Sequence, residues 1–258
     1  MRCENMETIP DNLVKFFEDN PKPALAFSGG VDSTYLMYVC RRLEVDMIPI
    51  TYTGGFQTVA QLANASNTSQ RYNFTPEFIE DDIFECKDII ANNEDRCYLC
   101  KKRMMGLIQK RAKKVERKYV MDGTNASDDS ADRPGMKALE ELGIRSPLKE
   151  CGITKEEVRR LSKLAGLPSW DRPPEACLAT RIPYGNMITE EALHRADLVE
   201  KEIRLMGFKD IRVRDNNGAA TLETLPSQKD MLEEMKPDIE KLLLEKYDSV
   251  SYRERKTQ

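Results

Sequence analysis

The stretch Ser28-Gly29-Gly30-Val31-Asp32-Ser33 follows the apolar run 24–27 and carries residue types that suit a polyphosphate. The two glycines can adopt backbone angles that other residues avoid, so the main chain can approach an oxygen closely. A helix that begins near Ser33 and Thr34 would direct free N–H groups and its positive dipole end at the same anion. The hydroxyl groups add donors, and Asp32 could hold the Mg²⁺ of a nucleotide. We therefore predict a nucleotide-phosphate loop here rather than a simple Gly-Gly turn.

Three cysteines form a second group of reactive residue types. Cys97 and Cys100 make a C-x-x-C pair just before a predicted helix, and Cys177 lies in a proline-rich segment. Cations at 96, 101, 102 and 181 favour the thiolate forms. The spacing alone leaves inert thiols, a redox pair, half of a zinc site and a three-thiolate 4Fe–4S cluster open as alternatives. The cysteines that we interpret as ordinary thiols are Cys3, Cys40, Cys86 and Cys151.

Polar residues also follow or occupy other predicted strands. Asp122, Thr124 and Asn125 come directly after a strand, so we expect them to line the nucleotide or carboxylate pocket. Arg212 and Arg214 are two positions apart on a predicted strand and therefore point to one face. Two adjacent guanidinium groups suit a phosphate, with a solvated strand face as the alternative. The weaker candidates for the same neighbourhood are Glu223 and Glu200.

Charged residues gather in a loop at 128–133. Asp128, Asp129 and Asp132 could ligate Mg²⁺, with simple solvation of the loop as the alternative. Arg133 in this loop, and Arg181 further along the chain, could neutralise a substrate carboxylate or an adenylate phosphate.

Strand and helix patterns alternate through the first two-thirds of the chain, which predicts an α/β fold with a parallel sheet sandwiched by helices. In such a sheet, ligands bind at the carboxyl ends of the strands. Prolines between 168 and 183 mark a boundary, so we expect one domain at 1–172 and a smaller α+β domain at 173–258. A hairpin turn is expected at Asn216-Asn217-Gly218, and a frayed tail from Arg253 to Gln258. The predicted strands are 23–27, 47–52, 73–79, 118–122, 210–214, 219–225 and 247–252, and the predicted helices are 11–19, 33–44, 57–70, 101–116, 134–142, 154–165, 189–206 and 236–246.

Composition narrows the class of protein. The 258 residues carry a net charge of −4 with 33% charged residues, so no global basic field points to nucleic acid. No apolar run approaches the roughly 20 residues that span a membrane. The first residues include an acid and no apolar core, so we expect no signal peptide and a cytoplasmic location. Seven cysteines, an odd number, argue for thiols, catalysis or metal rather than disulfides.

Several motifs together resemble one known family. In order along the chain they are SGGVDS at 28–33, DRCYLCK at 95–101, DGTNASDD at 122–129, DRPG at 132–135, SPL at 146–148, ACLATRIPYG at 176–185 and IRVR at 211–214. They resemble the LarE family of ATP-dependent sulfur transferases over nearly the whole chain. SGGVDS is similar to the pyrophosphatase loop (PP-loop) of enzymes that split ATP into AMP and pyrophosphate, and no Walker A pattern occurs. The resemblance implies a PP-loop ATPase fold of the adenine nucleotide alpha hydrolase type.

The resemblance also implies a reaction. ATP with Mg²⁺ would adenylate the carboxylates of pyridinium-3,5-biscarboxylic acid mononucleotide, and sulfur would then displace AMP to give thiocarboxylates for the nickel-pincer cofactor of lactate racemase. Family members that carry the C-x-x-C are linked to a 4Fe–4S cluster that passes on sulfide, which makes Cys97, Cys100 and Cys177 its expected ligands. Catalytic roles would fall to Cys177, Asp32 and Arg181. A sulfide donor and a second copy of the chain are the expected partners.

Three alternatives stay open. Family members without the C-x-x-C sacrifice the sulfur of the cysteine at the position of Cys177, which would leave the C-x-x-C pair of this chain without a role. Certain tRNA-thiolating enzymes share the ATP loop and a three-cysteine cluster, but they need a basic RNA-binding surface. An amidating enzyme related to NAD or GMP synthetases would use ammonia and would not need the C-x-x-C pair.

Overall fold

The computed structural model describes residues 8–128, 134–173 and 176–255. The chain forms two compact units, of which the second contains Gly55–Thr58, Asp82–Arg96 and the chain from Ala176 onward. The first unit contains the rest of the described chain. The sequence boundary at 172/173 lies close to the division before Ala176, but sequence patterns gave no reason to place the two earlier segments with the C-terminal part.

A parallel four-stranded sheet forms the centre of the first unit, as the alternating patterns predict. Its strands are β1 (Pro23–Ala26), β2 (Ile48–Thr53), β3 (Glu77–Glu80) and β4 (Tyr119–Met121), in the order β3-β2-β1-β4. All three neighbouring pairs are parallel, so the carboxyl ends of these strands lie at one edge of the sheet. The α/β prediction is confirmed.

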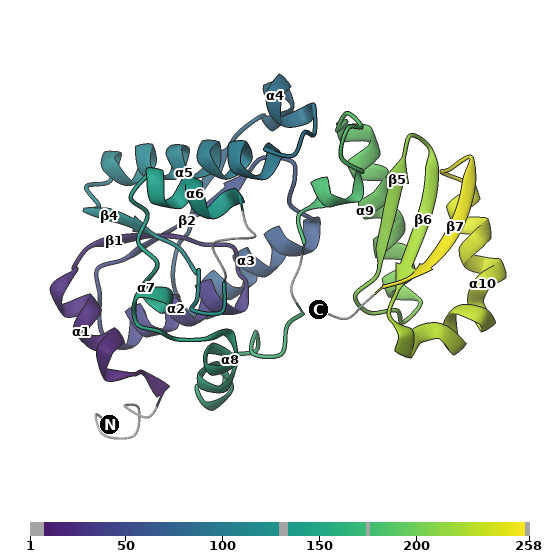
Figure 1. Cartoon of the computed structure of the whole chain (residues 1–258). Helices are drawn as coiled ribbons and strands as arrows, with labels where there is room; N and C mark the ends of the chain where they lie inside the picture. The colour runs from purple at the N-terminus through teal and green to yellow at the C-terminus, as the bar shows by residue number, and fades with distance from the viewer. Residues whose placement is uncertain (1–7, 129–133, 174–175, 256–258) are drawn as a thin grey trace. The chain divides into compact units, whose positions relative to one another are not determined.

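Helices cover both faces of this sheet (Figure 1). The side of β1 that carries Leu25 packs in one core with α1 (Asp11–Asp19), α2 (Val31–Arg42) and α8 (Lys155–Leu164). The side that carries Ala24 packs with α5 (Arg96–Lys114) and α6 (Pro134–Glu141). Alternate strand residues thus anchor opposite layers. The remaining elements of this unit are α3 (Val59–Arg71) and α7 (Pro147–Glu150).

The second unit has a three-stranded sheet in the order β5-β6-β7 (Figure 1). β5 (Arg212–Asn216) and β6 (Ala219–Thr224) are antiparallel, and β7 (Ser249–Glu254) runs parallel to β6. The positive φ angles of Asn217 (52°) and Gly218 (92°) confirm the expected hairpin turn. Further elements are η2 (Ile83–Glu85), α4 (Lys87–Ile90), η3 (Leu178–Arg181), α9 (Glu190–Leu205), η4 (Pro226–Gln228) and α10 (Lys229–Leu244).

The two faces of this small sheet differ sharply. Val213 and Leu222 point to one side, where they share a core with Val199 of α9 and Ile239 of α10. Because side chains alternate along a strand, Arg212 and Arg214 point to the other side. The sheet is therefore apolar on the helix-covered face and polar on the opposite face.

Some predicted boundaries are wrong. α5 begins at Arg96 rather than at 101, and its first turn includes the C-x-x-C pair. α10 begins at Lys229 although Pro237 lies inside it, because buried apolar residues anchor both halves of the helix against the core. The prediction that the tail frays from Arg253 is wrong. Arg253 and Glu254 belong to β7, and the Arg255 N–H donates to the Thr224 carbonyl at 2.8 Å. Among the described residues, none of the helices has the length and apolar character that a membrane crossing requires.

Candidate functional site

The loop after β1 has the conformation that its glycines predict. Gly29 has a φ of +72°, and a Cβ atom there would lie 2.7 Å from the backbone nitrogen of Ala65 in α3. Only glycine fits this position without strain. α2 begins at Val31, so its first N–H groups and its positive dipole end face the loop. The loop is also tied to itself, because the Ser28 hydroxyl lies 3.3 Å from the Ser33 hydroxyl.

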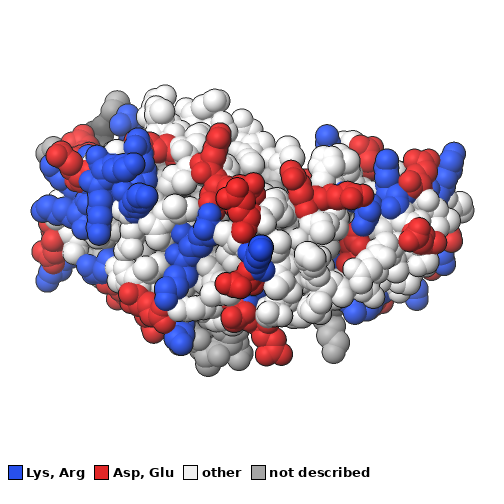
Figure 2. Space-filling model, turned by 90° about the horizontal axis from the view of Figure 1, so that it is seen from above, with Lys and Arg blue, Asp and Glu red and all other residues white. Residues whose placement is uncertain are grey.

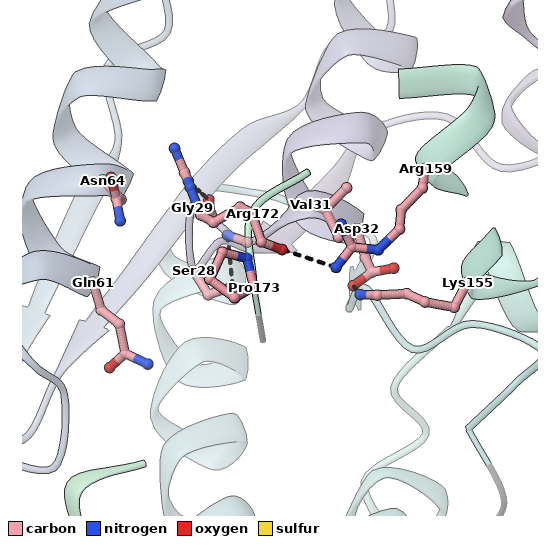
Figure 3. A pocket seen from close by; sticks show the side chains of 11 residues that line it. Ser28, Gly29, Val31, Asp32, Gln61, Asn64, Lys155, Arg159, Arg172 and Pro173 are labelled. Carbon is pink, nitrogen blue, oxygen red and sulfur yellow. Dashed lines mark hydrogen bonds and ion pairs between the residues drawn. The ribbon is translucent and has the colours of Figure 1, made fainter. Parts of the chain in front are cut away.

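A cavity of about 230 Å³ opens against this loop (Figure 3). Five of its lining residues are consecutive, from Ser28 to Asp32, as the sequence predicts. Three cations that sequence reasoning missed also line it, namely Lys155, Arg159 and Arg172. The other lining residues are Gln61, Asn64 and Pro173. A cavity with one carboxylate and three cations suits an anion larger than a single carboxylate.

Protein acceptors hold each of these cations in place. The Lys155 ammonium lies 2.5 Å from a carboxylate oxygen of Asp32. Arg172 donates to the Gly29 carbonyl at 2.5 Å, and Arg159 donates to the Trp170 and Arg172 carbonyls at 2.6 and 2.8 Å. Lys155 and Arg159 are one helical turn apart on α8 and so share a face. The cations are therefore fixed at the cavity wall.

The residues after β4 lie beside the same loop. Asn125 donates to Asp32 at 3.3 Å, and a Cβ atom at Gly123 would lie 3.0 Å from the Cβ of Asp32. Asp122 is buried and accepts bonds from the hydroxyls of Thr124 (2.6 Å) and Ser146 (2.8 Å). The parallel order of the sheet thus brings the predicted 28–33 and 122–125 segments together, although the 122–125 residues do not line the cavity itself.

Two of the predicted hydroxyl donors point into the protein. Ser33 is buried and donates to the Gly30 carbonyl at 3.3 Å, and Thr34 is fully buried inside α2. Asp128 accepts from the Asn125 N–H at 3.0 Å and so shapes its own turn. The other charged residues predicted for this loop lie outside the described residues, and they are Asp129, Asp132 and Arg133.

Two of the three predicted thiol ligands share one helical turn. Cys97 and Cys100 are partly buried at the start of α5, and residues three apart on a helix are neighbours. Cys177 is exposed and precedes η3 in the second unit. Among the described residues there is no cluster of three or more His, Cys, Asp or Glu that could hold a metal. Two thiols at C-x-x-C spacing supply half of the ligands of a tetrahedral thiolate site.

A polar network lies next to the C-x-x-C turn. Tyr52 at the end of β2 donates to Asp81 at 2.6 Å, and Arg103 of α5 holds the same carboxylate at 2.7 and 2.5 Å. Burial, the bond to Asp81 and nearby charges, including that of Cys100, raise the pKa of Tyr52. The bonds from Arg103 hold the pKa of Asp81 below its ordinary value. Sequence patterns gave no signal for this network.

Arg181 is paired inside the second unit. It donates to both oxygens of Glu200, at 2.7 and 2.8 Å, and the side chains of Arg181 and Glu200 are 4% and 0% exposed. It also donates to the carbonyls of Ala176 (3.1 Å) and Cys177 (3.5 Å). Arg181 therefore fixes the turn that carries Cys177.

Arginines gather on the polar face of the small sheet. We call Arg212, Arg214, Arg253 and Arg255 the arginine face. Strand register places Arg212 opposite Glu223 and Glu223 opposite Arg253, so these side chains share that face. The buried carboxylate of Glu223 binds both Arg214, at 3.0 Å, and Arg253.

One arginine of this face has unused hydrogen-bonding capacity. Within the part of the chain that the structure describes, Arg212 makes no hydrogen bond or ion pair. Burial, and then the positive charge of Arg255, lower the pKa of Arg212, and burial followed by Arg181 lowers that of Arg214. Arg255 binds Asp210 through one terminal nitrogen, while its Nε and its other terminal nitrogen are buried without a hydrogen-bond partner among the described residues. An anion bound here would relieve this repulsion.

The chain has relatives of similar length. It is 37% identical over 224 residues to an uncharacterised protein of Synechocystis, covering 86% of this chain and 84% of the relative. It is 32% identical over 215 residues to an uncharacterised protein of Methanocaldococcus jannaschii, covering 83% and 82%. It is 29% identical over 229 residues to the pyridinium-3,5-bisthiocarboxylic acid mononucleotide synthase of Lactiplantibacillus plantarum, covering 84% and 80%. No protein-family model matches the chain.

Because each of these matches covers more than four-fifths of the chain, each extends over both compact units. Together with the α/β fold and the expected loop conformation, they confirm the resemblance inferred from the motifs. The chain belongs to the LarE family.

Proposed function

We propose that the chain is an ATP-dependent sulfur transferase that adenylates the carboxylates of pyridinium-3,5-biscarboxylic acid mononucleotide and converts them to thiocarboxylates for a nickel-pincer cofactor. The observation that carries the proposal is the cavity at the glycine loop, where a helix N-terminus and three fixed cations face one space. The name of the Lactiplantibacillus relative, a synthase of the bisthiocarboxylic acid mononucleotide, supplies the substrate class.

In this proposal the loop binds the phosphates of ATP. Backbone N–H groups at the start of α2 and the cations Lys155, Arg159 and Arg172 stabilise the negative charge that collects on departing pyrophosphate. Asp32 would hold Mg²⁺ once the phosphates compete for Lys155. Adenylation replaces a poor leaving oxygen with AMP, so a sulfur nucleophile can attack the carboxyl carbon.

The arginine face is the proposed site for the phosphate of the mononucleotide. Arg212 has no hydrogen-bond partner among the described residues and can donate, and Arg214 lies two residues away on the same face. Glu223 holds Arg214 and Arg253 in fixed orientations, so it shapes the arginine face through them. Arg181 is occupied by Glu200, so we assign it the positioning of the Cys177 turn.

We further propose that Cys97, Cys100 and Cys177 hold a 4Fe–4S cluster. This rests on the resemblance and on the two thiols of one helical turn, which suit such a group. A cluster with three protein ligands would supply an iron that keeps hydrosulfide deprotonated. The chain contributes the thiolates, while Arg181 holds the backbone that precedes and includes Cys177. In the competing route, Cys177 gives up its own sulfur.

The deciding experiment is anaerobic purification followed by measurement of iron, sulfide and the visible spectrum. We expect about four irons per chain, lost in Cys97→Ser and Cys177→Ser but retained in the control Cys151→Ser. ATP–pyrophosphate exchange that depends on the mononucleotide should persist in all three variants, because adenylation needs no thiol. An iron-free protein that turns over once and loses the mass of hydrogen sulfide would favour the sacrificial route. Formation of an amide when ammonia is supplied as the nucleophile would favour the amidating alternative.

A second candidate, tRNA thiolation, is favoured by one observation. Lys and Arg side chains gather where α5 ends (Figure 2), and Lys110, Lys113 and Lys114 are exposed there. However, α5 leads into the start of β4, so this basic cluster lies at the amino edge of the parallel sheet, whereas the ATP loop lies at the carboxyl edge. Salt-dependent binding of tRNA, abolished by Lys113→Glu with Lys114→Glu, would support this candidate. If the chain binds no tRNA, the reaction on the small mononucleotide is favoured over tRNA thiolation.

A further inference from the structure

A separate cavity of about 410 Å³ lies over the polar face of the small sheet, next to the arginine that would bind phosphate. Three arginines line it, Arg96, Arg214 and Arg253, and no acidic residue is among its described lining residues. Thr221 and Asn216 add neutral polar groups. Two of these arginines, Arg214 and Arg253, share the single carboxylate of Glu223. The cavity therefore carries net positive charge and favours an anion.

One wall of this cavity is aromatic. Tyr184 is 57% exposed, and the Arg96 guanidinium lies 4.8 Å from its ring centroid. Arg96 is itself buried and donates to the Ala179 carbonyl at 3.1 Å, which fixes its orientation. Ile182 and Pro183 complete the apolar wall. A flat ring that carries a carboxylate matches this combination of an aromatic surface and guanidinium groups.

Strand register and strand order separate the arginines of this cavity from Arg212. Arg214 is paired with Thr221, and Arg212 is paired with Glu223 two residues further along the strands. Arg253 is paired with the same Glu223 from β7, so it lies level with Arg212 but two strands away, roughly 10 Å. A step of two residues along a strand is roughly 7 Å. Arg255 lies beyond that second level, on the side of Arg212 away from the cavity. The same sheet face thus offers two anion sites roughly 7 to 10 Å apart, and a small molecule with two anionic groups can reach both.

We propose that this cavity binds a carboxylate on the pyridinium ring while Arg212 and Arg255 bind the phosphate of the same molecule. The inference rests on the proposed mononucleotide substrate and adds a second recognition point to it. A substrate with two ring carboxylates can place one in this cavity while the other reacts. Recognition of the spare carboxylate would make the chain select a dicarboxylate over a ring with a single acid.

Isothermal titration of the full chain with nicotinic acid mononucleotide and nicotinamide mononucleotide tests this inference. The two probes differ in one group, a carboxylate against an uncharged amide. We expect the acid to bind about tenfold more tightly than the amide, as a charge-assisted hydrogen bond would give. Arg253→Gln should remove this preference, and Arg253→Lys should retain part of it. Arg212→Gln should weaken both probes about tenfold and leave the preference intact.

The control is Lys241→Gln, an exposed cation on α10, which packs on the opposite face of the sheet. It should change neither affinity. Because Arg253→Gln also removes a partner of Glu223, its thermal unfolding is measured in parallel, and Thr221→Val serves as a milder change in the same cavity. Equal binding of the two probes, no binding of either, or a preference that survives in Arg253→Gln would overturn the inference. The ATP–pyrophosphate exchange test is independent of these outcomes, so a failure here leaves the proposed adenylation standing.

Discussion

The glycine loop of the first unit and the arginine face of the second unit both offer positive charge to an anion, but different groups supply it. In the loop, backbone N–H groups supply part of it, because a helix begins directly after two glycines. Its cations lie at the cavity wall and are held by carbonyls and by Asp32.

On the arginine face, side chains alone supply the charge. Burial and mutual repulsion lower the pKa values of Arg212 and Arg214, and buried carboxylates keep the neighbouring guanidinium groups in place. The comparison indicates that the loop is vulnerable to changes in backbone geometry, whereas the face is vulnerable to loss of a buried charge.

The largest expected effect comes from Glu200→Ala in the second unit. It leaves the guanidinium of Arg181 buried without its carboxylate, which costs about 3–5 kcal/mol of unfolding free energy. Urea denaturation measures this loss. The control Glu191→Ala, on the same helix, removes an 88% exposed carboxylate that lies 3.7 Å from Arg195 and should leave the midpoint unchanged. Equal losses of stability in the two variants would mean that the buried carboxylate contributes no more to stability than the exposed one.

Gly29→Ala should break the loop of the first unit. The positive φ alone costs about 1–2 kcal/mol, and the added methyl group meets the backbone of Ala65. Gly143→Ala is a matched control, because Gly143 also has a positive φ (+62°) but has nothing within 4 Å of the added atom. We expect similar strain in both variants but loss of ATP binding in Gly29→Ala alone, measured by titration calorimetry. Retained ATP binding in Gly29→Ala would contradict a backbone-built site.

Lys155→Gln should weaken ATP binding about tenfold, the effect of one lost charge-assisted contact. The remaining N–H groups and arginines still bind the phosphates, so binding is reduced and not abolished. Arg160→Gln, on the same helix but not among the residues that line the cavity, should bind ATP as the parent does. If both variants lose affinity equally, the effect reflects overall charge rather than the cavity.

The smallest expected effect concerns Asp81 and acid stability. The bonds from Arg103 lower the pKa of Asp81, so its stabilising contribution is present above the ordinary aspartate pKa of about 4 and is lost as the pH falls through the lower value of the folded state. Asp81→Asn should therefore give a flatter dependence of the urea midpoint on pH between about 5 and 2. Parallel acid curves for the two proteins would show that Arg103 does not favour the charged form of Asp81.

Local signals predicted the loop well. Six consecutive residues specified a strand end, a glycine with positive φ and a helix start, and five of them line the cavity. Alternation along one strand predicted that Arg212 and Arg214 share a face. In each case the physics involves neighbours in sequence, so the sequence contains the needed information.

Other parts of the sites depend on contacts between distant segments. Lys155 and Arg159 reach the loop because α8 packs in the same core as α2, more than a hundred residues earlier. The prediction of a frayed tail from Arg253 was wrong because β6 supplies the backbone partners that order the end of the chain. A short polar strand has no apolar pattern of its own, so its order comes from pairing.

The sequence by itself determined the class of the fold, the conformation of the glycine loop, the thiol positions and the family, since these depend on local backbone preference and on residue spacing. Only the tertiary structure decided which cations line the loop cavity, that Arg181 is paired with Glu200, and that Arg253 and Arg255 belong to the arginine face. The physical reason is burial, because a charge removed from water takes its partner from whichever segment packs against it, however distant that segment is along the chain.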